Sequence, residues 1–189
     1  MPREGIFAEV LKGGCIEKGD KINVIEKEAG PYRVGIITVS DRASQGVYED
    51  KSGPVIKELV EEAGMEVIDC LIVPDEKSEI VKKLLHFSDQ RQADLIFTTG
   101  GTGFSKRDVT PEATKQVVER EVPGIGEALR SYSMTITPKA MLSRQTAGIR
   151  GNTLIINLPG SPKACRENIE YIMKPLKHGL GILSGRESD

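Results

Sequence analysis

The chain carries the sequence DLIFTTGGTGFSKRDVTPE at residues 94–112, and this strand–loop–helix pattern indicates how the rest of the fold is built. The apolar run Leu95–Thr98 predicts a short buried strand. Three glycines within Gly100–Gly103 follow, and a helix is predicted to begin with Thr110 as its N-cap and Pro111 at its first position. A glycine-rich loop at the carboxyl end of a strand suits phosphate or another anion. A tight turn also needs glycine, so the loop alone leaves both interpretations open.

The composition indicates a globular protein of one domain plus a small appendage. The chain has 189 residues, and its 38% hydrophobic and 29% charged content is ordinary for a soluble protein. A net charge of −2 gives no basic field for nucleic acid, and no apolar run is long enough to predict a membrane helix. Three widely spaced cysteines (Cys15, Cys70 and Cys165) without a CxxC pair predict reduced thiols rather than zinc, and hence a cytoplasmic protein.

Two regions differ in pattern. Residues 1–30 predict a short β-hairpin that turns at Gly13-Gly14, and such a hairpin is marginal alone. Residues 31–189 alternate between strand and helix patterns, which predicts an α/β sandwich with a mainly parallel sheet. The predicted strands are 34–39, 65–73, 95–98, 146–150 and 153–158, and the predicted helices are 52–63, 78–85, 110–120, 125–134, a turn at 138–142, one from Pro162 and a separate terminal one near 180–183.

Polar and glycine-rich segments follow four of these strands. They are Ser40-Asp41-Arg42, Pro74-Asp75, Gly100 to Asp108, and Pro159-Gly160-Ser161. Because ligands of parallel α/β sheets bind beyond the carboxyl ends of the strands, we expect these segments to meet at one edge.

Two carboxylates in this set are candidates for a metal site. Asp75 and Asp108 follow different strands and could share Mg²⁺, while Lys106 and Arg107 supply cations for phosphates. Either aspartate alone has a simpler interpretation, Asp75 as a turn residue and Asp108 as a charge at a helix N-terminus. Together, beside the glycine loop, they favour a functional site.

Other polar residues keep two interpretations. Asp41 and Arg42 either contact a ligand or pair with each other, and Lys51 either reaches a phosphate or is solvated. Ser161 either contacts a ligand or caps the helix that Pro162 begins. Arg144 either binds an anion in a bidentate way or is an ordinary surface arginine.

Five segments together resemble one known family, the molybdopterin adenylyltransferases (the MogA/MoaB family, related to the gephyrin G domain). They are TVSDRASQGVYEDKSGP (38–54), PDE (74–76), TTGGTGFSKRDVTPEAT (98–114), LSRQTAGIRG (142–151) and NLPGSPKA (157–164). The resemblance implies a three-layer α/β fold, a homotrimer, and Mg²⁺-dependent transfer of AMP from ATP to the terminal phosphate of molybdopterin, with release of pyrophosphate. The adenylylated product would then serve the molybdate-insertion enzyme.

The resemblance also assigns roles by position. Asp75 and Asp108 match the catalytic, metal-associated aspartates of the family. Four consecutive residues match the pterin- and phosphate-binding loop, and three more match positions that contact substrate: Gly100, Gly101, Thr102 and Gly103, then Ser40, Asp41 and Ser161.

Two alternatives remain besides this enzyme. The chain could carry molybdopterin or scaffold partners without turnover, although retention of both aspartates favours catalysis, or it could process another pterin or nucleotide. The sequence GIFAEVLKGGCIEKGDKI (5–22) resembles the closing segment of a MOSC domain, and this partial segment implies no activity of its own.

Overall fold

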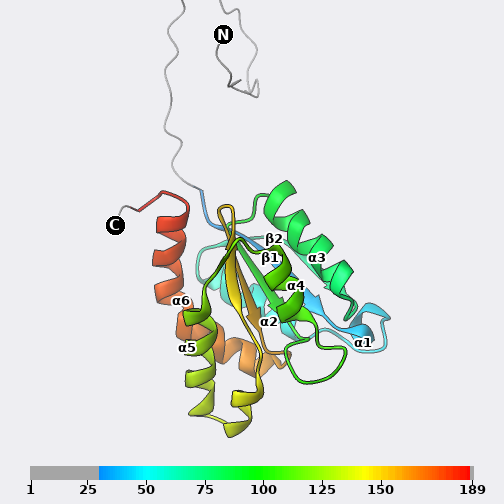
Figure 1. Cartoon of the computed structure of the whole chain (residues 1–189). Coiled ribbons are helices and arrows are strands. Elements are labelled where there is room, and N and C mark those ends of the chain that lie inside the picture. Colours follow the sequence, from blue (N-terminus) through cyan, green and yellow to red (C-terminus); the bar gives the residue numbers. More distant parts are fainter. Residues whose placement is uncertain (1–29, 188–189) are drawn as a thin grey trace, which may run out of the picture.

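One six-stranded sheet with helices on both faces forms the protein, as a computed structural model of residues 30–187 shows (Figure 1). The strand order is β2-β1-β3-β6-β5-β4, in which β2, β1, β3 and β6 are parallel and β5 is antiparallel to both of its neighbours, β6 and β4. The strands are β1 (Arg33–Val39), β2 (Glu66–Val73), β3 (Leu95–Thr99), β4 (Arg120–Glu121), β5 (Ala147–Arg150) and β6 (Thr153–Leu158). The predicted mainly parallel α/β fold is confirmed, whereas the predicted hairpin of residues 1–30 and Cys15 lie outside the described residues.

The central strands are buried on both faces, which explains their nearly continuous apolar sequences. All of β3 and β6 is buried, and so is β1 after Arg33. Alternate residues of β1 enter different cores: Val34 and Ile36 pack on one face of the sheet, and Ile37 and Val39 on the other.

The helices divide between these two cores and make the outer layers. Apolar residues of α2 (Ser52–Glu62), α5 (Pro123–Met134) and α6 (Pro162–Leu183) share one core with the sheet. Those of α3 (Lys77–Leu85), α4 (Thr110–Val117) and the π-helical η1 (His86–Gln90) share the other. No described helix is long and apolar enough to cross a membrane.

Four predicted helix boundaries were wrong. The chain from Pro162 forms one helix through Pro175 to Leu183, because Ile172, Leu176 and Leu180 continue a single buried stripe across the proline. Helix α4 ends at Val117, since β4 then pairs with β5.

The other two corrections concern helix starts. Pro123 begins α5 instead of breaking a helix, as its fixed φ suits the first turn. Thr110 is the first residue of α4 rather than its N-cap, which is Val109. The Thr110 hydroxyl instead donates to the Gly100 carbonyl at 2.9 Å, so tertiary contact replaces the local cap.

Candidate active site

The carboxyl ends of β1, β2, β3 and β6 bring the four polar segments to one edge of the sheet. The Ser40 backbone N–H donates to the Val73 carbonyl at 2.9 Å, which joins the end of β1 to that of β2. A Cβ atom on Gly160 would lie 3.4 Å from Gly100 Cα, so the segment after β6 touches the glycine loop. Segments far apart in sequence therefore share one site, as the parallel topology predicts.

The conformation of the glycine loop excludes side chains at two positions. Gly100 and Gly101 have φ values of 94° and 63°, in the left-handed region that favours glycine. A Cβ atom would lie 2.3 Å from the Val39 carbonyl oxygen at Gly100, and 2.3 Å from Thr110 Oγ1 at Gly101. The loop therefore approaches β1 and α4 more closely than any other residue type would allow.

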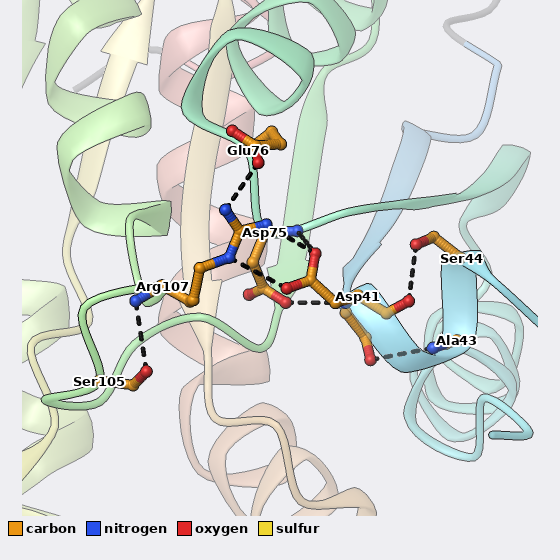
Figure 2. A network of polar contacts seen from close by, with 8 residues as sticks. Asp41, Ala43, Ser44, Asp75, Glu76, Ser105 and Arg107 are labelled. Carbon is orange, nitrogen blue, oxygen red and sulfur yellow. Dashed lines mark hydrogen bonds and ion pairs between the residues drawn. The ribbon is translucent and has the colours of Figure 1, made fainter. Parts of the chain in front are cut away.

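Asp41 and Asp75 lie together at the ends of β1 and β2, and Arg107 binds Asp41 and the neighbouring Glu76 (Figure 2). The Asp41 N–H donates to Asp75 Oδ2 at 2.8 Å, and the Asp75 N–H donates to Asp41 Oδ1 at 3.0 Å. Arg107 Nε and Nη2 bind both oxygens of Asp41 at 3.0 and 2.8 Å, while its Nη1 binds Glu76 at 2.6 Å. The hydrogen bonds from Arg107 hold the pKa of Asp41 below its ordinary value.

The pKa of Asp75 is shifted in the opposite direction from that of Asp41. Burial raises the pKa of Asp75, the negative charges of Asp41 and Asp108 raise it further, and the hydrogen bond from the Asp41 backbone opposes the shift. A bound cation would stabilise the charged form of a half-buried carboxylate that lies beside two other carboxylates.

Asp75 and Asp108 both border the glycine loop. A Cβ atom on Gly101 would lie 3.3 Å from Asp75 Oδ1, and one on Gly103 would lie 2.8 Å from Asp108 Oδ2. Asp108 Oδ2 also accepts a hydrogen bond from the Ser105 N–H at 2.8 Å. The two candidate catalytic carboxylates thus lie against the same loop, although they come from different strands.

This donor set fits a Mg²⁺ ion shared with a substrate phosphate. Within residues 30–187, no group of three or more His, Cys, Asp or Glu side chains is arranged to hold a metal alone. Mg²⁺ in nucleotide enzymes is commonly held by one or two carboxylates together with phosphate oxygens. Asp75 and Asp108 supply that number of carboxylates.

Two cavities flank the glycine loop. One of about 170 Å³ lies beside the end of β1 and the start of α2, with Ser40, Lys51 and Gly100 in its wall. Another of about 310 Å³ lies toward α5 and the 3₁₀ helix η2 (Pro138–Leu142), with Thr102 and Gly103 in its wall. Such an arrangement suits two substrates that meet at the loop.

Comparison with known proteins identifies the family. The family model described as "Probable molybdopterin binding domain" matches residues 35–178. The chain belongs to this family. A molybdopterin adenylyltransferase of Helicobacter pylori strain J99 is 46% identical over 154 residues, covering 80% of this chain and 88% of that protein. This confirms the family that the five sequence segments predicted.

Two further matches bear on the molybdopterin-binding domain. The crystal structure of the molybdopterin biosynthesis enzyme MoaB from Thermus thermophilus superimposes with a TM-score of 0.78 at 46% identity, covering 82% of this chain and 97% of that chain. Gephyrin of Dictyostelium discoideum is 43% identical over 175 residues, covering 85% of this chain but 24% of gephyrin. The structural match and the family model therefore identify the same family.

Several residues of this molybdopterin-binding domain have partners that the sequence did not indicate. Ser40 Oγ accepts from the Ala43 N–H at 3.2 Å and caps the short helix α1 (Asp41–Ser44). Arg42 lies over the ring of Tyr48 at 5.0 Å and does not pair with Asp41. The pairing of Asp41 and Arg42 that the sequence allowed is thus replaced by the pair of Asp41 and Arg107.

The remaining candidates have different environments. Ser161 is exposed at the N-cap position of α6, but its side chain makes no capping hydrogen bond. Lys51 is exposed at the wall of the smaller cavity. Arg144 is partly exposed, and its guanidinium binds the Gly103 and Asp108 carbonyls and the Glu112 carboxylate.

Sequence reasoning missed Asp50. Its Oδ1 accepts from the N–H groups of Ser52 and Gly53 at 2.9 and 3.0 Å, and its Oδ2 accepts from Thr38 Oγ1 at 2.7 Å. Asp50 thereby fixes the start of α2 against β1 within the smaller cavity. An aspartate two residues before a helix start was the available signal.

Proposed function

We propose that this chain catalyses adenylyl transfer from ATP to molybdopterin, giving adenylyl-molybdopterin and pyrophosphate in molybdenum cofactor biosynthesis. The name of the H. pylori relative supports this activity. The observation that carries the proposal is that Asp75 and Asp108 border one glycine loop, and this loop contributes to the walls of two cavities.

The reaction balances without an additional reactant. An oxygen of the molybdopterin phosphate forms a bond to the α-phosphorus of ATP, and the bond from that phosphorus to the oxygen bridging to the β-phosphate breaks. The leaving group is pyrophosphate. Because a phosphate monoester is largely ionised near pH 7, no side chain has to remove a proton from the nucleophile.

The residues of this chain orient and stabilise the charged groups. Backbone N–H groups of Gly100–Gly103 position the anions, and Ser40, Asp41 and Ser161 contact the substrates. Asp75 and Asp108 would hold Mg²⁺, which offsets negative charge on the phosphates when bound. The raised pKa of Asp75 is consistent with a carboxylate that gains from a bound cation.

Further properties belong to the same proposal, some implied by the family resemblance and some by the cysteine pattern and the MOSC-like segment. They are a homotrimer, a cytoplasmic location, delivery of the product to the molybdate-insertion enzyme, and a division into a partial MOSC-like segment (1–30) and the molybdopterin-binding domain (31–189). Analytical ultracentrifugation of the full chain tests the trimer directly.

Pyrophosphate release with purified ATP and molybdopterin tests the activity, and mass spectrometry of the product identifies the adenylyl group. We expect release only when both substrates and Mg²⁺ are present. Calorimetry provides the contrast with a carrier: binding of molybdopterin without binding of Mg²⁺-ATP, and without pyrophosphate, would overturn the proposal.

A further inference from the structure

Arg144 binds the glycine-loop region through its backbone and through its guanidinium. Its Nε donates to the Gly103 carbonyl at 2.7 Å, and its Nη2 donates to the Asp108 carbonyl at 2.5 Å. Its backbone N–H donates to the Thr102 carbonyl at 2.9 Å, and its Nη1 pairs with Glu112 in the first turn of α4. One residue thus contacts both ends of the segment that leads from the glycines to Asp108.

The backbone that carries Arg144 is itself anchored on the outer helices. The next carbonyl, that of Gln145, accepts from Arg130 Nη1 of α5 at 2.6 Å. The Gln145 side chain donates to Asn168 of α6 at 3.2 Å, and a Cβ atom on Gly126 would lie only 2.8 Å from the Gln145 carbonyl oxygen. Close packing and hydrogen bonds therefore fix the base of the Arg144 side chain.

The segment between the two clamped carbonyls is exposed and is held in its middle by the ion pairs of Arg107 with Asp41 and Glu76. Residues 104–107 are exposed, and Phe104 retains 71% of its accessible surface. The local hydrogen bonds join Ser105 and Asp108 to each other: the Asp108 N–H donates to the Ser105 carbonyl at 3.0 Å, and the Ser105 N–H donates to Asp108 Oδ2. The position of the Asp108 carboxylate hence depends on the ends of the segment, which Arg144 holds, as well as on the Arg107 ion pairs in its middle.

We propose that Arg144 is a positioning residue, which holds residues 103–108 so that the Asp108 carboxylate stays at the glycine loop; this inference rests on the proposed function. A planar guanidinium can donate from Nε and Nη2 to two carbonyls at once. The ammonium of lysine is a single point on a flexible stem and cannot reproduce this geometry. A positive charge at this position is thus insufficient to hold the segment, and we expect Arg144→Lys to lose the positioning of Asp108.

The first measurement is turnover in Arg144→Lys, with Arg144→Met as a second variant and Arg166→Lys as a matched control. Arg166 is an arginine of α6 whose partners are the exposed Glu58 and Glu170. Because a displacement of about 1 Å can cost roughly 100-fold in rate, we expect kcat to fall about 10- to 100-fold in both Arg144 variants. We expect KM for ATP to change less, half-maximal activity to need more Mg²⁺, and Arg166→Lys to behave as the wild type.

A double-mutant cycle separates positioning of Asp108 from general stability. If Arg144 acts through Asp108, Arg144→Lys should lower kcat in the wild-type background and have little further effect in Asp108→Ala. Equal losses in both backgrounds, or full activity of Arg144→Lys, would overturn the inference.

Limited proteolysis provides a readout that does not need catalysis. Trypsin cleaves after Lys106 and Arg107, so release of the clamp should speed cleavage at these positions in Arg144→Lys and leave the cleavage rate of Arg166→Lys unchanged. An unchanged cleavage rate in Arg144→Lys would contradict the clamp. Should the wild type release no pyrophosphate, the proposed function is wrong, whereas the proteolysis comparison still decides whether Arg144 holds the segment.

Discussion

Asp41 and Asp75 are joined by two reciprocal hydrogen bonds, in which the backbone N–H of each residue donates to the carboxylate of the other at 2.8 and 3.0 Å. The residues are 34 positions apart, so these bonds fix the end of β1 to the end of β2 directly beside the glycine loop. The same contact brings two negative charges together. Arg107 binds Asp41 directly, whereas it acts on Asp75 only through its charge, and burial still raises the pKa of Asp75.

The first prediction concerns Asp108. Replacing it with alanine removes a carboxylate from the proposed cation and phosphate site, and we expect pyrophosphate release to fall by about 100-fold or more. Circular dichroism should show an unchanged fold, since the side chain is only partly buried. Asp69→Ala, in the edge strand β2, provides a control that should retain activity. An unimpaired Asp108→Ala enzyme would contradict the assigned role.

The second prediction separates function from stability at Asp75. Burial raises the pKa of this carboxyl above its ordinary value of 3.8, so the folded state holds the proton more tightly than the unfolded chain does. The contribution of Asp75 to stability therefore falls as the pH rises from the unfolded-state pKa of 3.8 through the raised pKa of the folded state. At pH 7 we expect Asp75→Asn to raise Tm by up to about 2–4 °C while turnover is lost.

Thermal unfolding measured across a range of pH tests whether Asp75→Asn raises Tm as expected. The difference between Asp75→Asn and the wild type should shrink as the pH falls below 3.8, where the aspartate is protonated in both states. Asp69→Asn should leave Tm unchanged at pH 7. A lower Tm for Asp75→Asn at pH 7 would mean that the hydrogen bond from Asp41 outweighs the cost of the buried charge.

The third prediction concerns Arg107→Gln, which should lower Tm at pH 7, whereas Asp75→Asn should raise it. Because Arg107 lowers the pKa of Asp41, this pair stabilises the fold above the ordinary pKa of 3.8, and the contribution is lost as the pH falls through the lowered value. We expect a lower Tm than the wild type at pH 7 and converging values in acid. Salt at about 1 M should reduce the difference, since the pair is exposed. A difference independent of pH would exclude Asp41 as the partner that matters.

The fourth prediction compares two glycines with similar backbone angles. Gly101 and Gly151 have φ values of 63° and 52°, but an added Cβ atom meets Thr110 Oγ1 at 2.3 Å at Gly101 and nothing within 4 Å at Gly151. We expect Gly151→Ala to cost about 1 kcal/mol in the free energy of unfolding, from backbone strain alone. Gly101→Ala should cost about 2–4 kcal/mol, because overpacking is added to the strain.

Urea unfolding measures both costs, and the activity assay distinguishes the two positions further. Gly101→Ala should lose pyrophosphate release, whereas Gly151→Ala, in the turn between β5 and β6, should retain it. Equal costs at the two sites would mean that Thr110 moves aside without loss.

Sequence patterns located the buried strands well because their apolar character is local. The predicted strands 34–39 and 153–158 differ by at most one residue from β1 and β6, whose side chains fill both cores. Patterns failed where tertiary contacts decided the outcome. A separate terminal helix near 180–183 was predicted, but burial of one continuous stripe across Pro175 keeps α6 continuous.

The sequence by itself determined the β/α alternation, the glycine loop and the family, because each depends on residues close together in the chain or on motifs in a given order. Only the tertiary structure decided which charged groups meet. Arg107 binds Asp41 across 66 positions, and Arg144 binds the Gly103 carbonyl across 41. The physical reason is that a guanidinium can pair with any carboxylate or carbonyl within reach, and the packing of parallel strands and outer helices selects which of them lie within that reach.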